Sequence, residues 1–239
     1  LCGAPIIHRP EDIDRLKTPS VLSSAPLVRV LTAIAGLKAR LGDTVPIIAV
    51  AISPFSLPVM QMGFDRYLEL MHEQPERFRH LMQLNEDFTV AWANAQLAAG
   101  ATAICYFDPV SSTTNIPRTL YLDTGQQVAK RTIARIKGPT ATHLASGRSL
   151  PIIADIADTG TAVIGVSVLE DLRQLKAAAA GRVSLLGNLN GVEMRRWTPA
   201  EAELQVKRAI ARAGRGGGFI LGDNHGEIPW QVSDETLLA

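Results

Sequence analysis

The chain has 239 residues, of which 46% are hydrophobic, and its formal net charge at pH 7 is +1. This balance of charge gives no reason to expect a polyanionic partner such as nucleic acid. Cys2 and Cys105 are the only cysteines, which excludes a disulfide framework and a four-cysteine zinc site and favours a reducing cytoplasm. The apolar stretches are strand-sized or broken by charge, so no membrane span or signal peptide is expected.

One unit recurs along the chain: a short apolar run rich in β-branched residues ends at a polar residue and is followed by a helical pattern. Such runs without alternation are typical of strands buried on both faces of a parallel sheet. The expected strands cover residues 45–52, 101–107, 139–142, 162–166, 183–186 and 219–221.

The helices between these runs follow from apolar spacing. From Glu76 to Leu97 apolar residues recur at three- and four-residue steps, and Gly100 follows as a stop signal. A second helix is expected from Pro199 to Ala213, with Thr198 as its N-cap. Shorter helices are expected over residues 27–41, 126–136, 150–159 and 169–179.

Six βα units suggest a parallel barrel, although a closed (β/α)8 barrel has eight such units. The first residues are expected to form a loop and a short helix, so two N-terminal units would be absent or supplied by another chain. The alternative is an open, doubly wound six-stranded sheet. That alternative lacks support because no Gly-x-Gly fingerprint follows any expected strand.

Five segments carry a family resemblance: "ISPFSL", "AQLAAGATAICYFDP", "THLASG", "GRVSLLGNLN" and "GGFILGDNHGEIP". In this order and spacing they resemble the signature segments of the uroporphyrinogen decarboxylase superfamily. The resemblance implies an α/β fold, a (β/α)8 TIM barrel of which this chain carries the last six βα units. Residues 1–239 would form a single barrel domain that lacks its N-terminal part, with the active cleft at the carboxyl ends of the strands.

The superfamily implies two activities. Its decarboxylases remove acetate carboxyl groups from uroporphyrinogen without a metal or organic cofactor. Its methyltransferases resemble methylcobalamin:coenzyme M enzymes, which move a methyl group from a corrinoid to a thiolate held on zinc. The zinc of that branch would be held by a His-x-Cys pair and a later Cys, but this chain has Ala145 and His225 where the two cysteines would stand.

The polar residues at the strand ends are the candidate catalytic groups. His225, Asp108 and His143 are predicted to be catalytic, with Asp108 or Asp223 stabilising a cation and His225 delivering a proton. If zinc binds, His143 and His225 would be its ligands, with one carboxylate from Asp108, Asp223 or Glu227.

Other residues near these ends are predicted to contact substrate or to line the cleft. Met60 stands near the place where the decarboxylases carry a substrate-contacting Tyr, and methionine cannot make that hydrogen bond. Cys105 lies among apolar neighbours and is expected to be an inert core thiol. The predicted substrate-binding residues are Ser111, Ser112, Arg148, Asn188, Asp223 and Met60.

The leading hypothesis is therefore acid–base decarboxylation of a carboxylated, tetrapyrrole-type small molecule, without a cofactor. The first alternative is methyl transfer, which would require zinc and a corrinoid as cofactors and would have a corrinoid protein as its partner. The second is a binding or scaffold barrel that has lost its catalytic ligands. A homodimer is expected in the cytoplasm, with neither nucleic acid nor membrane as a partner.

Overall fold

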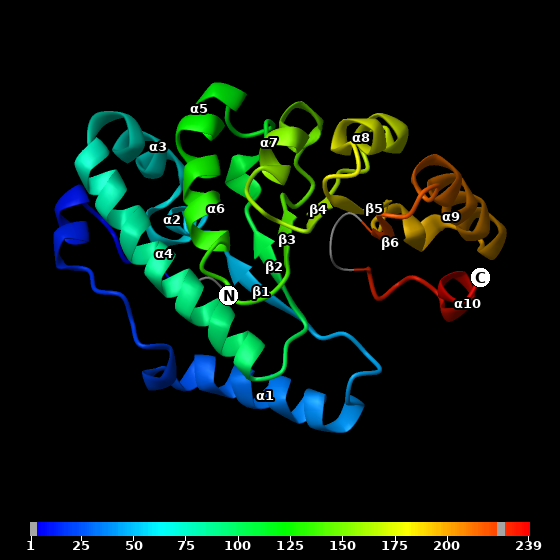
Figure 1. The fold of residues 1–239 in the computed structure, drawn as a ribbon, viewed down its shortest axis with the longest axis horizontal. Coiled ribbons are helices and arrows are strands. Elements are labelled where there is room, and N and C mark those ends of the chain that lie inside the picture. The colour runs from blue at the N-terminus through cyan, green and yellow to red at the C-terminus, as the bar shows by residue number, and fades with distance from the viewer. Residues whose placement is uncertain (1–3, 224–227) are drawn as a thin grey trace.

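The computed structural model describes residues 4–223 and 228–239, and its centre is a sheet of six parallel strands (Figure 1). The strands are β1 (Ile48–Ile52), β2 (Ala103–Phe107), β3 (Thr140–His143), β4 (Val163–Gly165), β5 (Ser184–Leu189) and β6 (Phe219–Asp223). Each pairs with the next along the chain, in the order β1-β2-β3-β4-β5-β6. A doubly wound sheet reverses its strand order at a switch point, so this sequential order excludes that alternative. It is the order of consecutive βα units in a (β/α)8 barrel wall.

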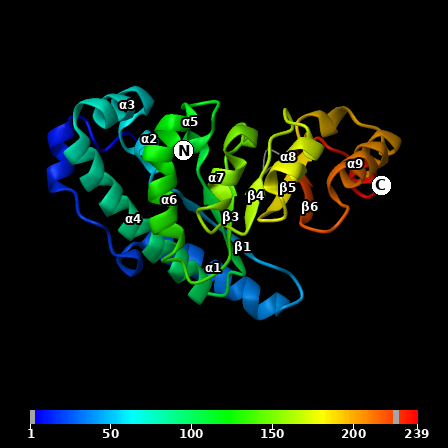
Figure 2. The ribbon, with the colours of Figure 1, turned by 45° about the horizontal axis from the view of Figure 1, so that its top comes forward.

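Helices lie beside the strands and follow one another across the molecule in the same order (Figures 1 and 2). The helices expected from Glu76 to Leu97 and from Pro199 to Ala213 are confirmed as α4 (Pro75–Ala98) and α9 (Pro199–Ala213). The others are α1 (Ala25–Leu41), α2 (Leu57–Met62), α3 (Phe64–Glu73), α5 (Arg118–Asp123), α6 (Gly125–Ile133), α7 (Ile153–Ala157), α8 (Leu172–Ala179) and α10 (Asp234–Leu237). Short 3-10 helices cover Pro10–Arg15, Val21–Ser23, Pro109–Ser111, Leu150–Ile152 and Glu193–Arg196.

Helices α5 and α10 were not predicted, and two further segments differ from the expectation. Helices α2 and α3 were not predicted; Gly63 separates them with φ at +89°, a conformation that glycine adopts without strain. The helix expected over residues 150–159 is divided into a 3-10 turn and α7, with Pro151 in the turn.

The two faces of the sheet have different surroundings. On β1, Ala49 and Ala51 face the helices and are buried, whereas Ile48 and Val50 are 55% and 53% exposed. The same alternation continues on β2, where Ile104 and Tyr106 are buried. The expectation of burial on both faces therefore holds only for the helix-facing side, and residues of the other face line a cavity described below.

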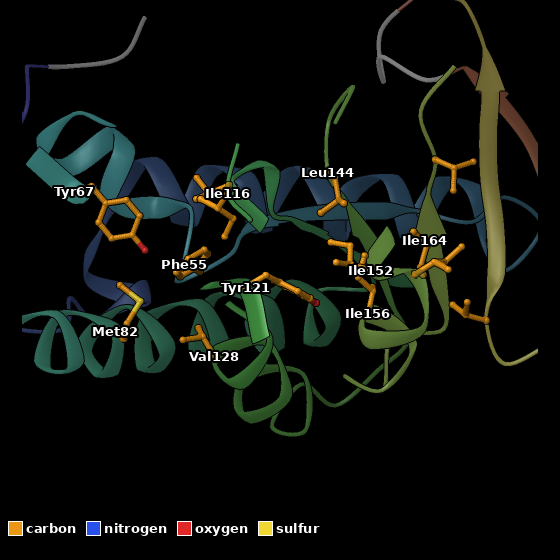
Figure 3. Packing of buried hydrophobic residues seen from close by; sticks show 14 of the residues in the cluster. Phe55, Tyr67, Met82, Ile116, Tyr121, Val128, Leu144, Ile152, Ile156 and Ile164 are labelled. Carbon is orange, nitrogen blue, oxygen red and sulfur yellow. The ribbon is translucent and has the colours of Figure 1, made fainter. Parts of the chain in front are cut away.

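A hydrophobic cluster anchors the loop that follows β1. Phe55 and Tyr67 are fully buried, with ring centroids 5.8 Å apart in an edge-on arrangement. Figure 3 shows this cluster extending from Phe55 and Tyr67 to Ile156 and Ile164. No helix in the described part of the chain is both long and apolar enough to span a bilayer.

The N-terminus of α9 provides a test of this local structure. The Thr198 side chain accepts a hydrogen bond from the Glu201 backbone N–H, and the Glu201 carboxylate accepts one from the Thr198 N–H at 2.7 Å. Loss of such a cap costs about 1 kcal/mol, so Thr198→Ala is expected to lower the free energy of unfolding by about that amount in denaturant titration. Ser24→Ala is the matched control, because Ser24 precedes α1 without a side-chain cap bond and should change stability little. Equal losses in both variants would contradict the assignment of the cap.

Candidate active site

The face of the sheet that points away from the helices, called the concave face below, holds a cavity of about 440 Å³. Most of its described walls are apolar, and among the described residues His143 and Asp223 are the ionisable side chains besides Cys105 that line it. Burial raises the pKa of the Cys105 thiol to about 11, so it stays protonated at neutral pH, as expected of an inert thiol. The lining residues are Ile48, Val50, Cys105, Phe107, Ala141, His143, Leu186, Gly222 and Asp223.

Strand register fixes the position of the His143 ring. His143 lies opposite Phe107 on β2 and Gly165 on β4. The Phe107 ring stacks on the imidazole with centroids 6.0 Å apart and an interplanar angle of 24°. A Cβ atom at position 165 would stand 2.4 Å from His143 Cδ2, so the glycine leaves the space that the imidazole occupies.

A backbone hydrogen bond fixes the tautomer of His143. The Ala145 N–H donates to Nδ1 at 3.1 Å, and Ala145 adopts a left-handed conformation with φ at +55°. Since Nδ1 accepts this bond, the neutral imidazole carries its proton on Nε2. His143 therefore offers a neutral N–H donor. Burial lowers its pKa and the Asp223 charge opposes that shift.

Asp223 ends β6 on the same cavity, opposite Leu189 in the strand register. Asn224, His225 and Glu227 lie outside the described residues, so the predicted roles of His225 in proton delivery and zinc binding stay predictions. Within the described ranges, no group of three His, Cys, Asp or Glu side chains is placed to hold a metal ion.

The chemistry of His143 also bears on zinc. A histidine that binds a metal through Nε2 normally donates its Nδ1–H to a neighbouring acceptor. Here Nδ1 accepts from Ala145, which leaves the proton on the nitrogen that would have to bind the metal. The described residues therefore do not fit the zinc site expected of the methyltransferase branch.

Asp108 lies in a separate, fully polar cluster at the ends of β1 and β2. Its carboxylate is 1% exposed and accepts hydrogen bonds from Ser53 Oγ at 2.5 Å, Ser56 Oγ at 2.7 Å and Ser111 Oγ at 2.6 Å. No cation pairs with it among the described residues. Burial raises the pKa of Asp108, and the three hydroxyl donors partly offset that rise. Through Ser53 and Ser56, Asp108 clamps the loop after β2 to the loop after β1, and Ser111 donates from within the same loop as Asp108.

Ser112 and Arg148 meet in the next pair of loops through the backbone. Ser112 Oγ donates to the Arg148 carbonyl at 3.1 Å, and the Arg148 N–H donates to Thr114 Oγ1 at 3.1 Å. The Arg148 side chain is exposed. These contacts join the loop after β2 to the loop after β3.

Asn188 performs a similar task at the end of β5. Its Nδ2 donates to the carbonyls of Ser167 at 2.8 Å and Glu170 at 3.1 Å. The side chain thus holds the loop between β4 and α8.

Met60 lines a second cavity, of about 330 Å³, beside the first. Phe107 borders both cavities. Apart from Ser56 and Asn115 the walls are apolar: Ile52, Val59, Met60, Phe64, Phe107, Pro109 and Val110. A substrate contact at Met60 would therefore be apolar.

Sequence reasoning missed four residues that shape the site: Ser53, Ser56, Phe107 and Gly165. Ser53 and Ser56 follow the first apolar run. Polar residues after the other apolar runs were considered as site residues, and the same signal could have found these two serines. Gly165 had no comparable signal, because its role depends on which residue lies beside it on the neighbouring strand.

Six sequential parallel strands with ionisable groups at their carboxyl ends define a barrel protein of the kind that carries small-molecule chemistry at the strand ends. The model of one family, uroporphyrinogen decarboxylase (URO-D), matches residues 2–239. The chain belongs to this family.

Named relatives agree with this assignment. The chain is 28% identical over 234 residues to a uroporphyrinogen decarboxylase of Methylococcus capsulatus, covering 91% of this chain and 64% of that protein. It is 26% identical over 235 residues to the uroporphyrinogen decarboxylase of Cellvibrio japonicus, covering 91% and 63%. The chain thus spans less than two thirds of the length of these curated relatives.

Solved structures show the same fold. A methyltransferase from Methanosarcina mazei superposes with a TM-score of 0.83 at 18% identity, covering 95% of this chain and 67% of that one. A B12-independent methionine synthase from Shewanella sp. W3-18-1 gives a TM-score of 0.58 at 16% identity, with coverages of 87% and 62%.

The serine clamp predicts a large stability effect. Asp108→Ala removes the acceptor of three buried hydroxyls and leaves them without that partner, so the free energy of unfolding should fall by about 3 kcal/mol or more. Asp123→Ala, at an exposed position at the end of α5, should change it by less than about 0.5 kcal/mol. Chemical denaturation of both variants measures the difference. A loss below about 1 kcal/mol for Asp108→Ala would show that the carboxylate does not hold these loops together.

His143 predicts a pH effect with a defined sign. Its folded pKa is lowered, so its contribution to stability is present above the unfolded pKa of about 6.5 and is lost as the pH falls through the folded value. NMR titration should give a midpoint below 6.5. Because the Asp223 charge raises the pKa, Asp223→Asn should move the midpoint lower still. A midpoint above 6.5, or an upward shift in the variant, would contradict this environment.

Proposed function

We propose that this protein catalyses acid–base decarboxylation of a carboxylated, tetrapyrrole-type small molecule in the cavity on the concave face of its sheet. The observation that carries the proposal is the pair of groups on the cavity wall. Neutral His143 offers an N–H donor, fixed by Ala145, and Asp223 offers a carboxylate. A pyrrole acetate has complementary groups, an acidic carboxyl and a ring N–H.

The reaction places defined demands on such a site. A proton adds to the ring carbon next to the one that bears the acetate side chain, which makes the ring cationic. The carbon–carbon bond to the carboxylate then breaks, carbon dioxide leaves, and the bonding electrons neutralise the ring. A second proton completes the new methyl group as the first leaves the ring carbon, so one proton is consumed for each carbon dioxide released.

Two described residues match these demands. The Asp223 carboxylate would bind the ring N–H and stabilise the cation, because opposite charge in a poorly solvated cavity lowers the energy of that intermediate. The His143 Nε2–H would donate to the substrate carboxylate and orient it. The proton donor predicted from the sequence is His225. The relatives named uroporphyrinogen decarboxylase support this chemistry.

Methyl transfer is the second candidate. Met60 favours it, because the apolar cavity around this residue lacks the tyrosine hydroxyl that the resemblance implies for decarboxylases. The methyltransferase of Methanosarcina mazei shares the fold. This reading requires zinc, a corrinoid and a corrinoid protein, and the tautomer of His143 counts against the zinc ligand set. We therefore place decarboxylation first.

The test is anaerobic incubation of the natural protein with uroporphyrinogen, with separation of the porphyrins formed after oxidation. The wild type should yield products with fewer carboxyl groups. Asp223→Asn and His143→Ala should each lower kcat by about 100-fold or more, whereas His143→Gln, which keeps an N–H donor, should retain more activity than His143→Ala.

Exposed residues provide the controls. His72→Ala and Asp65→Asn, both on α3, should leave the rate unchanged. Metal analysis of the same preparations separates the candidates. Stoichiometric zinc lost in His143→Ala, without porphyrinogen turnover, would replace decarboxylation by methyl transfer. If the protein shows neither porphyrinogen turnover nor bound zinc, the binding or scaffold hypothesis is the one that remains.

A further inference from the structure

A third cavity, of about 370 Å³, lies between α8, the end of β5 and α9. It shares no lining residue with the cavity that holds His143 and Asp223. Its walls come from the loop before α8, from the end of β5, from the 3-10 helix Glu193–Arg196 and from one face of α9. The proposed function makes no use of this cavity.

Two arginines on α9 give this cavity its character. Arg208 and Arg212 both line it, and neither makes an ion pair or hydrogen bond with any residue in the described ranges. They stand four residues apart, so their side chains leave the helix about 5–6 Å from each other on one face. Like charges at this spacing repel. The helix dipole stabilises a cation in the last turn of a helix, which explains the presence of Arg212 there. Arg208 lies one turn earlier, so the dipole does not explain its presence.

Several other cations of the protein form ion pairs. Lys207, the neighbour of Arg208, pairs with Glu203 four residues earlier. Arg118 and Arg131, on α5 and α6, are held by Asp155 and Glu86. Arg208 and Arg212 have no such carboxylate partner among the described residues.

The acidic residues of the same cavity are already engaged. Glu170 accepts hydrogen bonds from the Ser149 N–H at 2.9 Å and the Leu150 N–H at 2.8 Å. Glu193 pairs with Arg196. Neither carboxylate bonds to Arg208 or Arg212, so within residues 4–223 and 228–239 no carboxylate is paired with either guanidinium group.

The neutral part of the wall indicates the shape of a ligand. Trp197 is half-buried and provides an aromatic surface, and the amides of Gln205 and Asn190 provide further hydrogen-bonding groups. Guanidinium groups bind phosphate oxygens through paired N–H donors. The volume exceeds that of a single phosphate ion and leaves space for an attached ring or chain.

We propose that this cavity binds the phosphate group of a small phosphorylated molecule through Arg208 and Arg212, with Trp197 against the organic part. The site is independent of the decarboxylation cavity. It depends on the charge of two side chains on one helix face, so it can be tested without knowledge of the reaction.

The test is isothermal titration calorimetry of the natural protein with inorganic phosphate, phenyl phosphate and benzoate, at pH 7 and constant ionic strength. Saturable binding of phenyl phosphate is expected at one site, tighter than that of inorganic phosphate because the ring adds contact with Trp197. Tighter binding of inorganic phosphate would instead identify the free ion as the ligand and overturn the role of Trp197. Benzoate should bind more weakly than phenyl phosphate, since it carries one charge.

Variants separate this site from general charge effects. Arg208→Ala combined with Arg212→Ala should weaken phenyl phosphate binding by at least about tenfold, while the double lysine variant should bind with intermediate affinity because lysine keeps the charge without the planar fork. Arg173→Ala, at an exposed position on α8 outside the cavity, should have no effect. Unchanged binding in the double alanine variant, equal weakening by Arg173→Ala, or no saturable binding of any phosphate would overturn the proposal. Circular dichroism melting of each variant checks that it is folded.

Discussion

The parallel register of the six strands is the constraint on which the candidate site depends. It places Phe107, His143 and Gly165 side by side on three neighbouring strands. The aromatic ring supports one face of the imidazole, and the missing side chain of the glycine makes room for it. A slip of one residue would turn His143 toward the helices, because successive side chains on a strand point to opposite faces. The chemistry of the cavity thus follows from strand pairing.

The strand ends are then braced by polar contacts that hold loop to loop. The Asp108 clamp joins the loops after β1 and β2, Ser112 joins those after β2 and β3, and Asn188 holds the loop after β4. Each uses a buried or half-buried polar group whose partners are on another segment, so loss of one partner would leave the other unsatisfied. Among the described residues, the cavity itself is lined by few polar groups, chiefly His143 and Asp223.

The sequence predicted the six strands well, because apolar runs between turn signals are a local property of the chain. The same reasoning placed Asp108, His143 and Asp223 at one edge of the sheet. It could not say which way each side chain points: Asp108 faces three serines, whereas His143 faces the cavity. That difference depends on contacts between residues more than fifty positions apart, such as Ser53 and Asp108. Helices α2 and α3 escaped prediction because Pro58 and Gly63 resemble loop signals when read locally.

The central claim is that His143 is a neutral hydrogen-bond donor at the concave cavity, and its tautomer tests this most directly. Long-range proton–nitrogen NMR of the imidazoles at pH 7.5, with His143→Gln to assign the signal, distinguishes the two ring nitrogens. The account predicts an unprotonated Nδ1 and a protonated Nε2 for His143. A protonated Nδ1 with Nε2 free or bound to a metal would contradict the account and favour the zinc-dependent alternative.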